Sequence, residues 1–379
     1  MPKYRFSEIA YNSTAKKKPT EADKDTYIGL EHLDSGSLTV SRWGSDVAPI
    51  GEKLIMKKGD VLFGKRRAYQ KKVAIAPFDG IFSAHGMVLR PNEAVITQEY
   101  FPLFISSDYF LDEAIRISVG SLSPTVNWKD LKDLAFNIPT IEEQKRITPL
   151  VWAAIESKNA YIALLERTDE LVKSQFIEIF GDSAIAQSPW PKANMDDVFS
   201  ITSSRRILKS EWKTEGSIPF IRVRDMVQLA NKEPLTNEFF VSEEFYASRP
   251  DEEKVIPGDI IVSATSTIGK TYIIKPGERF YFKDADVLLF RKKRPINEVF
   301  FTYGLTQPTM WDQISGGLGA TTVAHLLISK ACKLIQTLPP MELQERFAIL
   351  AQQADKSKFE LKQAIERIDN LIKSLIQQG

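Results

Sequence analysis

Two segments of this chain repeat the same pattern of residue types 200 positions apart. NIPTIEEQKRI starts at Asn137 and TLPPMELQERF starts at Thr337, and each contains a proline followed by Glu-x-Gln-x-Arg. Each segment leads into a long helical pattern. A duplication at half of the chain length predicts two copies of one folding unit, and it constrains the fold more than any other feature of the sequence.

The duplication extends through most of both halves. Four further pairs of segments match in the same order: TYIGLEHLDSG (26–36) with PFIRVRDMVQ (219–228), KKGDVLFGKRRAYQKKVAIAP (57–77) with IPGDIIVSATSTIGKTYIIKP (256–276), FSAHGMVLRP (82–91) with FKDADVLLFRK (282–292), and VGSLSPTVNWKDL (119–131) with GGLGATTVAHLLI (316–328). Repeats of this length predict tandem domains, because solenoid repeats are only 20–50 residues long.

The first part of each copy has the pattern of short strands. VAIAP, MVLRP, DIIVSA, TYIIKP and DVLLFRK are rich in β-branched residues and end at Gly, Pro, Asp or Lys. The pairs Gly59-Asp60 and Gly258-Asp259 predict turns that lead into strands.

The last part of each copy predicts a helix that starts just after Pro139 or Pro340 and stops at Gly181 or Gly379. Apolar residues follow a heptad seam in the same phase in both helices, interrupted by Lys158 in one and by Lys358 in the other. We therefore expect an α+β chain in which two strand-rich heads are separated by an antiparallel two-helix coiled coil of about 50 Å, with its termini close together. The alternative is two unrelated amphipathic helices.

Composition excludes several protein classes. The chain has 379 residues and a net charge of +1, with no apolar run long enough to cross a bilayer and no signal-like start. A single cysteine, Cys332, excludes an internal disulfide framework, and three scattered histidines make a metal centre unexpected. We expect a cytoplasmic protein without a metal site.

The first head carries a basic and aromatic stretch, FGKRRAYQKK (63–72). Lysine and arginine suit DNA phosphates, whereas Arg and Gln can also pair with base edges in the major groove. The candidate DNA-binding residues of this head are Lys65, Arg66, Arg67, Tyr69, Gln70, Lys71, His85, Ser121 and Thr125. The alternative for the stretch is a solvated turn, and KKKP (16–19) is expected to be a flexible basic loop.

The segments of the second head align with those of the first, but the polar residues at matching positions differ. Lys65, Arg66 and Arg67 align with Ala264, Thr265 and Ser266. The candidates here are Arg205, Arg206, Arg222, Arg224, Ser266, Thr267, Lys270, Thr321 and Thr322. Such a difference favours two readers of different sequences over a symmetric reader of a palindrome.

Other motifs do not predict chemistry. ATSTIGKT (264–271) fits a relaxed phosphate loop, but the residues after it predict a strand where that loop requires a helix. RPDEEK (249–254) and GGLGAT (316–321) are interpreted as surface loops, and no Ser-His-Asp or Cys-His arrangement is found. We expect no catalytic site.

The order and duplication of these motifs resemble the specificity (S) subunit of type I restriction–modification enzymes. The resemblance covers essentially the whole chain and is carried by PTIEEQ and PPMELQ before the helices, GDVLFGKRR and GDIIVSATSTIGK, LSPTV and GATTV, and the WPKANMDDVFSITSS start of the second head. RFSEIA, close to Met1, matches NMDDVFS, so we expect no leader before the first head.

This resemblance implies four regions: target recognition domains at 1–138 and 182–338 (the first and second heads) and conserved helical regions at 139–181 and 339–379. Each head would read one half of a bipartite, asymmetric DNA site. The helices would set the gap and bind two methyltransferase (M) subunits; the residues implied are Glu142, Gln144, Arg146, Tyr161, Leu165, Glu342, Gln344, Arg346, Leu361 and Ile365.

The chain itself would be non-catalytic and hold no cofactor. S-adenosylmethionine, ATP and magnesium would belong to the M subunits and the motor-nuclease (R) subunits. Two alternatives remain at this point: a protein-interaction scaffold that does not bind DNA, and a nuclease or methyltransferase whose motifs are not evident.

Overall fold

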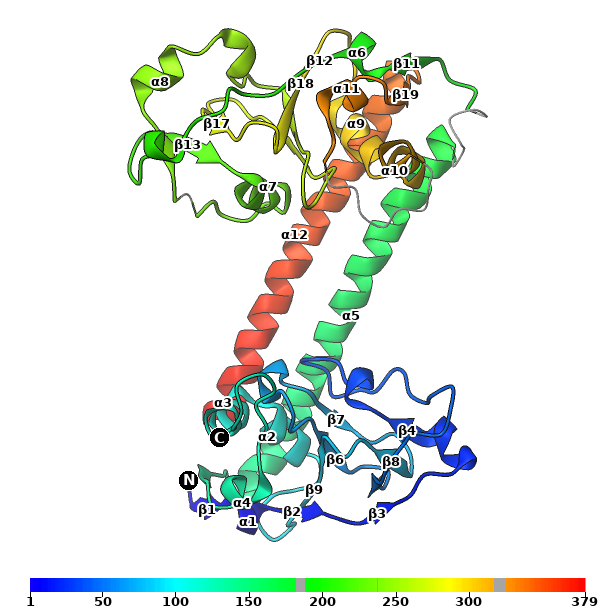
Figure 1. Ribbon diagram of the computed structural model, residues 1–379. Helices are drawn as coiled ribbons and strands as arrows, with labels where there is room; N and C mark the ends of the chain where they lie inside the picture. Colours follow the sequence, from blue (N-terminus) through cyan, green and yellow to red (C-terminus); the bar gives the residue numbers. More distant parts are fainter. Residues whose placement is uncertain (182–187, 237, 317–324, 379) are drawn as a thin grey trace. The chain divides into compact units, whose positions relative to one another are not determined.

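The structure, a computed structural model, describes residues 1–181, 188–236, 238–316 and 325–378. The chain divides into two compact units, Met1–Leu164 with Glu360–Gly379, and Leu165–Phe359 (Figure 1). Each unit therefore contains one head and parts of both long helices.

The first unit begins with a strand and one helical turn and ends its head with a short strand before the first long helix. Its strands are β1 (Lys3–Arg5), β2 (Ala10–Ser13), β3 (Lys16–Lys17), β4 (Tyr27–Ile28), β5 (Lys53–Met56), β6 (Val61–Phe63), β7 (Val73–Ile75), β8 (Gly80–Phe82), β9 (Met87–Pro91) and β10 (Ala135–Asn137). Its helices are α1 (Phe6–Ile9), α2 (Phe101–Ser106), α3 (Asp108–Arg116), α4 (Trp128–Leu131) and the first part of α5 (Ile141–Phe180).

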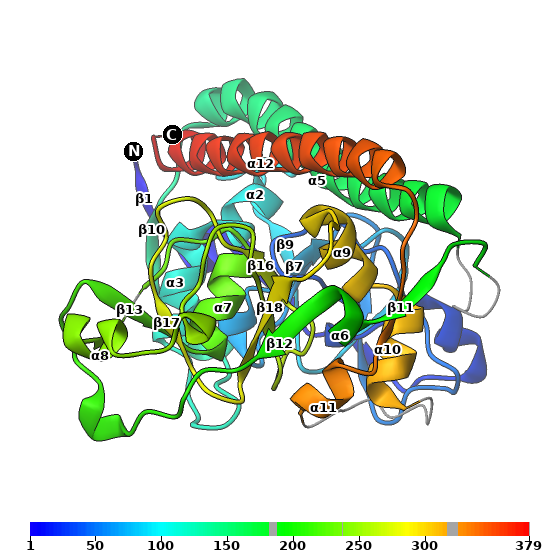
Figure 2. The same ribbon diagram turned by 90° about the horizontal axis from the view of Figure 1, so that it is seen from above.

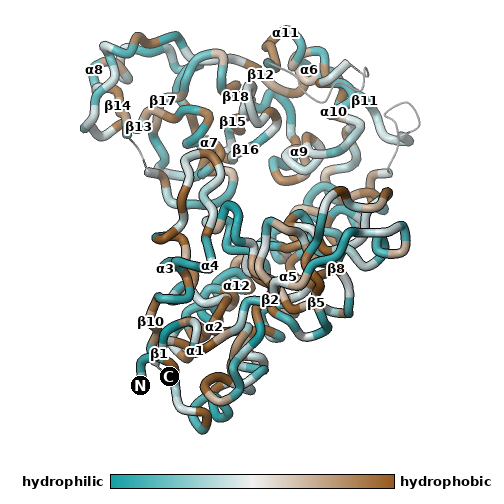
Figure 3. Tube along the Cα trace, turned by 60° about the horizontal axis from the view of Figure 1, so that its bottom comes forward, coloured by the Kyte–Doolittle hydropathy of each residue, from teal (hydrophilic) through white to brown (hydrophobic). Residues whose placement is uncertain are grey.

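Two four-stranded sheets form this head, in the orders β2-β9-β6-β7 and β3-β5-β8-β4. All neighbours are antiparallel except β4 and β8. Strand β6 is buried on both faces: Val61 and Phe63 join the core with α2 and α3, while Leu62 joins a second core with β5 and β8. Hydrophobic segments gather around α2 and β10 (Figure 3).

The second unit repeats this order. Its strands are β11 (Lys192–Asn194), β12 (Phe199–Thr202), β13 (Ile218–Ile221), β14 (Phe240–Val241), β15 (Ile260–Ser263), β16 (Thr271–Ile273), β17 (Tyr281–Phe282), β18 (Val287–Lys292) and β19 (Ile335–Thr337). Its helices are α6 (Met195–Val198), α7 (Val223–Ala230), α8 (Glu243–Ala247), α9 (Glu298–Leu305), α10 (Pro308–Ser315), α11 (Ile328–Ala331) and the first part of α12 (Met341–Gln378).

The sheet topology confirms the internal repeat. The order β12-β18-β15-β16 corresponds to β2-β9-β6-β7, and the parallel pair β13–β17 corresponds to β4–β8. Each of the five predicted strand segments contains a strand. One alignment was wrong by three residues: it paired Trp128 with His325, but Thr125 and His325 make the equivalent bridges, to Arg66 and Thr265.

The two Gly-Asp turns are held by ion pairs between a buried aspartate and a partly exposed arginine. Asp60 accepts a backbone hydrogen bond from Lys57 and pairs with Arg90 of β9 at 2.7 Å. Asp259 accepts one from Ile256 and pairs with Arg291 of β18 at 2.7 Å. Each carboxylate thus joins a turn to the neighbouring strand, which explains why the motif occurs in both heads.

The long helices begin at Ile141 and Met341, as predicted, and α5 ends at Phe180, before Gly181 with φ +91°. Gln144, with no exposed surface, accepts from the Thr97 amide at 2.8 Å and donates to the Val95 and Pro139 carbonyls. Gln344 makes the same contacts with Asn297 and Pro339. Their expected role in subunit binding is therefore corrected: both side chains are buried, bond to backbone groups and fasten a helix to its head.

In each unit the two long helices lie side by side, and the ends that meet show an antiparallel pairing (Figures 1 and 2). In the first unit Val151 and Ile155 of α5 belong to a core that includes Ile372 of α12. In the second unit, Val172 and Phe176 of α5 join Phe347 of α12. The helix seam expected from the heptads is confirmed.

The two lysines that interrupt the seam make the same ion pair in both units. Lys158 contacts Asp369 at 2.6 Å, and Lys358 contacts Asp169 at 2.9 Å. The two lysines are 200 positions apart in the sequence, and so are the two aspartates. Lys358 also contacts Asp355, and Asp355 makes a second ion pair with Lys232 at 3.0 Å. Burial would raise the pKa of Asp355, but its two lysines hold the pKa below the ordinary value.

Replacing Lys358 by Glu should destabilise the full chain by about 1–3 kcal/mol, because Asp169 and Asp355 would face a third carboxylate. The ion-pair contribution of Asp355 is complete above the unfolded carboxyl pKa and is lost as pH falls through the lower folded value. The difference between wild type and K358E should therefore shrink below about pH 4. Urea denaturation at several pH values measures this difference in the free energy of unfolding. Lys356→Glu, at an exposed position of α12, is the matched control, and equal effects of the two changes would contradict this prediction.

Candidate nucleic-acid interface

Three connections of the first head meet at one end of the β2-β9-β6-β7 sheet. They are the β6–β7 connection (64–72), the turn at 83–86 and the loop at 118–125. The Arg66 amide donates to the His85 carbonyl at 3.1 Å, and the Arg67 amide donates to the Pro124 carbonyl at 2.7 Å. The Val126 amide donates to the Lys65 carbonyl at 2.9 Å. Backbone bonds thus hold the basic stretch in a fixed position.

The β6–β7 connection stores backbone strain. Arg67 and Lys71 both adopt the left-handed conformation, with φ values of 56° and 50°, on either side of a short 3-10 turn (Ala68–Gln70). Ser266, the counterpart of Arg67 in the second head, has φ 58°. Left-handed residues other than glycine are uncommon and concentrate at functional sites. The same strain in both heads marks this connection as a candidate site.

The surface around this connection is positive in the first head. Burial, followed by the nearby Arg66, Lys65 and Lys53, lowers the pKa of His85 below its ordinary value. Burial and the charge of Lys16 lower the pKa of Lys65. We call Lys16, Lys53, Lys65, Arg66, Arg67 and His85 the basic cluster. Lys16 also makes an exposed ion pair with Glu52 at 3.9 Å, but the lysines and arginines outnumber this one carboxylate and favour a polyanionic ligand.

The remaining candidates of the first head fall into two groups. Tyr69 and Ser121 are exposed, and Gln70 and Thr125 are half-buried beside the basic cluster. Lys71 points elsewhere: its ammonium contacts Asp108 at 2.8 Å and Asp112 at 2.9 Å on α3. Its expected DNA contact is corrected to a structural ion pair, because two carboxylates already satisfy the charge.

The second head presents hydroxyl groups where the first presents guanidinium groups. Ser266, Thr267 and Lys270 are exposed on the β15–β16 connection, and the Thr265 hydroxyl lies 3.3 Å from an Asp286 carboxylate oxygen. Lys283 pairs with the same aspartate. This surface therefore mixes hydroxyl, acidic and basic groups, unlike the basic cluster.

Four arginines of the second head lie in two environments. Arg205 and Arg206 are exposed, and the two serines before them donate to the Val287 and Phe282 carbonyls. Arg222 is half-buried over the Phe239 ring and pairs with Asp225 and Glu238, and Arg224 pairs with Glu238 at 2.7 Å. The DNA-binding prediction for Arg222 is corrected, since its guanidinium is used inside the head. Thr321 and Thr322 lie outside the described residues.

Sequence reasoning missed two members of the basic cluster, Lys16 and Lys53. KKKP was expected to be a flexible loop, but Lys16 and Lys17 form β3, which pairs with Lys53 and Leu54 of β5. This pairing brings basic residues from distant parts of the chain to the same surface. The unusual density of lysine in KKKP was the only local signal.

The candidate subunit-binding residues on the helices differ in exposure. Glu142, Arg146, Tyr161, Glu342 and Arg346 are exposed, whereas Leu165, Leu361 and Ile365 are half-buried in the seam. The heptad pattern did not identify two exposed leucines that are 200 residues apart in the sequence. Leu171 is 53% exposed and Leu371 is 51% exposed. Ile349 and Phe359 are also largely exposed.

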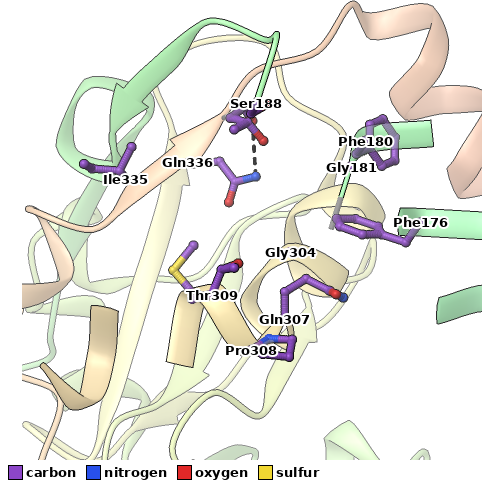
Figure 4. Close-up of a pocket in the computed structure, with 12 residues that line it drawn as sticks. Phe176, Phe180, Gly181, Ser188, Gly304, Gln307, Pro308, Thr309, Ile335 and Gln336 are labelled. Carbon is purple, nitrogen blue, oxygen red and sulfur yellow. Dashed lines mark hydrogen bonds between the residues drawn. The ribbon is translucent and has the colours of Figure 1, made fainter. Parts of the chain in front are cut away.

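The predicted absence of a phosphate loop is supported by local structure. Lys270 and Thr271 lead into strand β16, so no helix N-terminus follows ATSTIGK to hold a phosphate. A cavity beside Phe176, Gly304 and Gln336 in the second unit (Figure 4) has a volume of about 50 Å³, too small for a nucleotide. Among the described residues, no group of three His, Cys, Asp or Glu side chains could hold a metal ion.

None of the helices in the described part of the chain combines the length and the hydrophobicity that a membrane span requires.

Two solved structures share this fold. A chain from a study of complex assembly and conformational transition of the type I R-M system has a TM-score of 0.61 at 18% identity and covers 100% of this chain and 96% of that chain. The type I restriction–modification S subunit from M. genitalium has a TM-score of 0.56 at 16% identity, with 99% and 96% covered.

Two curated relatives match parts of the sequence. The EcoDI specificity subunit of Escherichia coli is 24% identical over 211 residues, which are 54% of this chain and 46% of that protein. The MjaIX specificity subunit of Methanocaldococcus jannaschii is 25% identical over 285 residues, 69% of this chain and 63% of that protein. The chain thus spans about half of the first relative and less than two thirds of the second.

The family model for the type I restriction modification DNA specificity domain matches residues 6–153 and 187–369. The two matches follow the internal repeat and together include most of both heads, the start of α5 and most of α12. The chain therefore belongs to the family of type I restriction–modification DNA specificity domains.

Proposed function

We propose that this chain is a DNA-reading specificity subunit in which each head recognises one half of a bipartite, asymmetric site. The observation that carries this proposal is that the two heads share a backbone fold but present different side chains at matching positions. The β6–β7 and β15–β16 connections each have a left-handed residue at the matching position, Arg67 in the first head and Ser266 in the second, and Arg66 aligns with Thr265. Two heads of one fold that present different polar groups would select different base sequences.

Each head combines non-specific and specific contacts. In the first head Lys16, Lys53 and Lys65 neutralise phosphates, and Arg66 or Arg67 pairs with guanine edges in the major groove. In the second head Ser266 and Thr267 offer hydroxyl groups that can donate or accept, and Arg205 and Arg206 supply the positive charge. The exposed Tyr69 adds a further hydrogen-bonding group.

The long helices set the gap between the half-sites and carry the docking surface for two M subunits. Support comes from the exposed Leu171 and Leu371, which occupy repeat-related positions and offer two similar apolar contacts. A groove of about 420 Å³ beside Trp152, Ile155 and Ile372 in the first unit offers further apolar surface.

Under this proposal the chain contributes recognition and the partners contribute chemistry. The M subunits bind S-adenosylmethionine and methylate adenine, and R subunits bring ATP- and magnesium-dependent cleavage. The chain itself needs no catalytic group, and its place of action is the cytoplasm.

The double substitution R66A/R67A should weaken binding of a target duplex by roughly 10–100-fold at physiological salt, because it removes two cations that contact DNA. The slope of log affinity against log salt should also become shallower by about 1–2. Fluorescence anisotropy of the full chain, purified with its M subunit, measures both quantities.

The matched control for this prediction is K57A/K58A. These two exposed lysines lie in the turn before β6, at the opposite end of that strand from Arg66. An equal loss of affinity in both double variants would contradict a localised contact surface, and unchanged binding by R66A/R67A would place the interface elsewhere.

Deleting one heptad from each long helix, residues 161–167 together with 361–367, should shorten the gap between half-sites by about 3 base pairs. Seven residues correspond to about 10 Å of helix, and successive base pairs are ~3.4 Å apart. Both half-sites should remain unchanged. The test is selection of bound duplexes from a random pool, with the wild-type chain and the deletion variant each assembled with M subunits.

A deletion from α5 alone provides the control for the heptad experiment. With α5 alone shortened, the Lys158–Asp369 and Asp169–Lys358 pairs cannot both form, so the register of the two helices is lost and selection of a split site should be abolished. Altered half-sites at constant spacing in the double deletion would refute the spacer role.

A further inference from the structure

The loop at 118–125 holds one apolar side chain almost completely in solvent. Leu122 is 90% exposed at the tip of this loop, between Ser121 and Ser123. The loop is closed by two backbone bonds between Val119 and Thr125, at 3.0 and 2.9 Å, and the Thr125 hydroxyl donates to the Ser123 carbonyl. Gly120, with φ +118°, provides a turn conformation that other residues rarely adopt. The tip is therefore a closed turn with a fixed direction.

This tip is attached to the basic cluster rather than to the rest of the surface. The Arg67 amide donates to the Pro124 carbonyl, and the Arg67 guanidinium lies 3.3 Å from the Ser123 hydroxyl. Arg66 bridges to Thr125 on the adjacent strand edge. Leu122 therefore belongs to a loop that is bonded to both arginines, next to the surface proposed to bind DNA.

The chemistry of duplex DNA limits what Leu122 can contact favourably. Phosphates and most base edges are polar, and a leucine placed against them gains little. In the major groove the apolar group on the base edges is the 5-methyl group of thymine. Burying apolar surface against that methyl group is favourable, as it is in a protein core.

We propose that Leu122 contacts the 5-methyl group of a thymine in the half-site read by the first head, and so determines specificity at that base pair. This inference rests on the proposed function of the chain. It concerns the first head alone, because residues 317–324 of the second head lie outside the described part of the structure.

The test begins with duplexes selected by the wild-type chain assembled with its M subunits. Each thymine of the first half-site is then replaced in turn by deoxyuridine, which lacks only the methyl group. At one position the wild type should lose about fourfold in affinity, the effect of roughly one buried methyl-sized group. Leu122→Ala should bind the thymine duplex about fourfold more weakly and show no further loss with deoxyuridine at that position.

Two control variants separate the contact from general effects. Leu122→Met keeps an apolar side chain and should retain the deoxyuridine sensitivity. Val47→Ala removes another exposed apolar residue of the same head, outside the basic cluster, and should behave like wild type. Because Leu122 and Val47 are both exposed, none of these changes should affect folding.

Three results would overturn the inference. In the first, the wild type is indifferent to deoxyuridine at every thymine of the first half-site. In the second, Leu122→Ala keeps full sensitivity to deoxyuridine. In the third, 2-aminopurine in the half-site brightens on binding of wild type but not of Leu122→Ala, which would show a wedge between bases instead. Failure of the wild type to select any split site would instead refute the proposed function itself.

Discussion

Two buried glutamine side chains fasten the long helices of this protein to its heads. Gln144 and Gln344 sit in the first turns of α5 and α12, where their amides bond to backbone groups of the head just before α2 and α9. A buried amide group that loses its partner costs about 1–3 kcal/mol, so each joint resists bending between head and helix. Under the proposed function, these joints would let a helix of fixed length hold a head at a fixed position on DNA.

Much of this architecture could be predicted because the sequence contains two copies of the same pattern. A pattern seen in both halves identified the strands, the Gly-Asp turns, the helix starts and the seam with its two lysines. The repeat also explains the Lys158–Asp369 and Lys358–Asp169 pairs, because any contact between the two helices that follows the repeat must occur twice.

The errors arose where polarity was taken as evidence of function. Gln144 and Lys71 lie in polar segments that predict surface contacts, yet one is buried and the other is neutralised by α3. Lys16 and Lys53 are far from the β6–β7 connection in sequence and approach it only through the pairing of β3 with β5. A sequence without a pairing register cannot show which charges gather on one face, and the same limit hid the exposed position of Leu122 beside Arg66 and Arg67.

The most direct test of the central claim is a genome-wide map of methylated adenine in cells that express this chain with its methyltransferase. We expect one motif in two unlike parts, separated by a fixed run of unspecified bases, and replacement of residues 1–138 by the first head of a relative should change only one part. A contiguous motif, or a palindrome with identical halves, would contradict two heads that read different sequences.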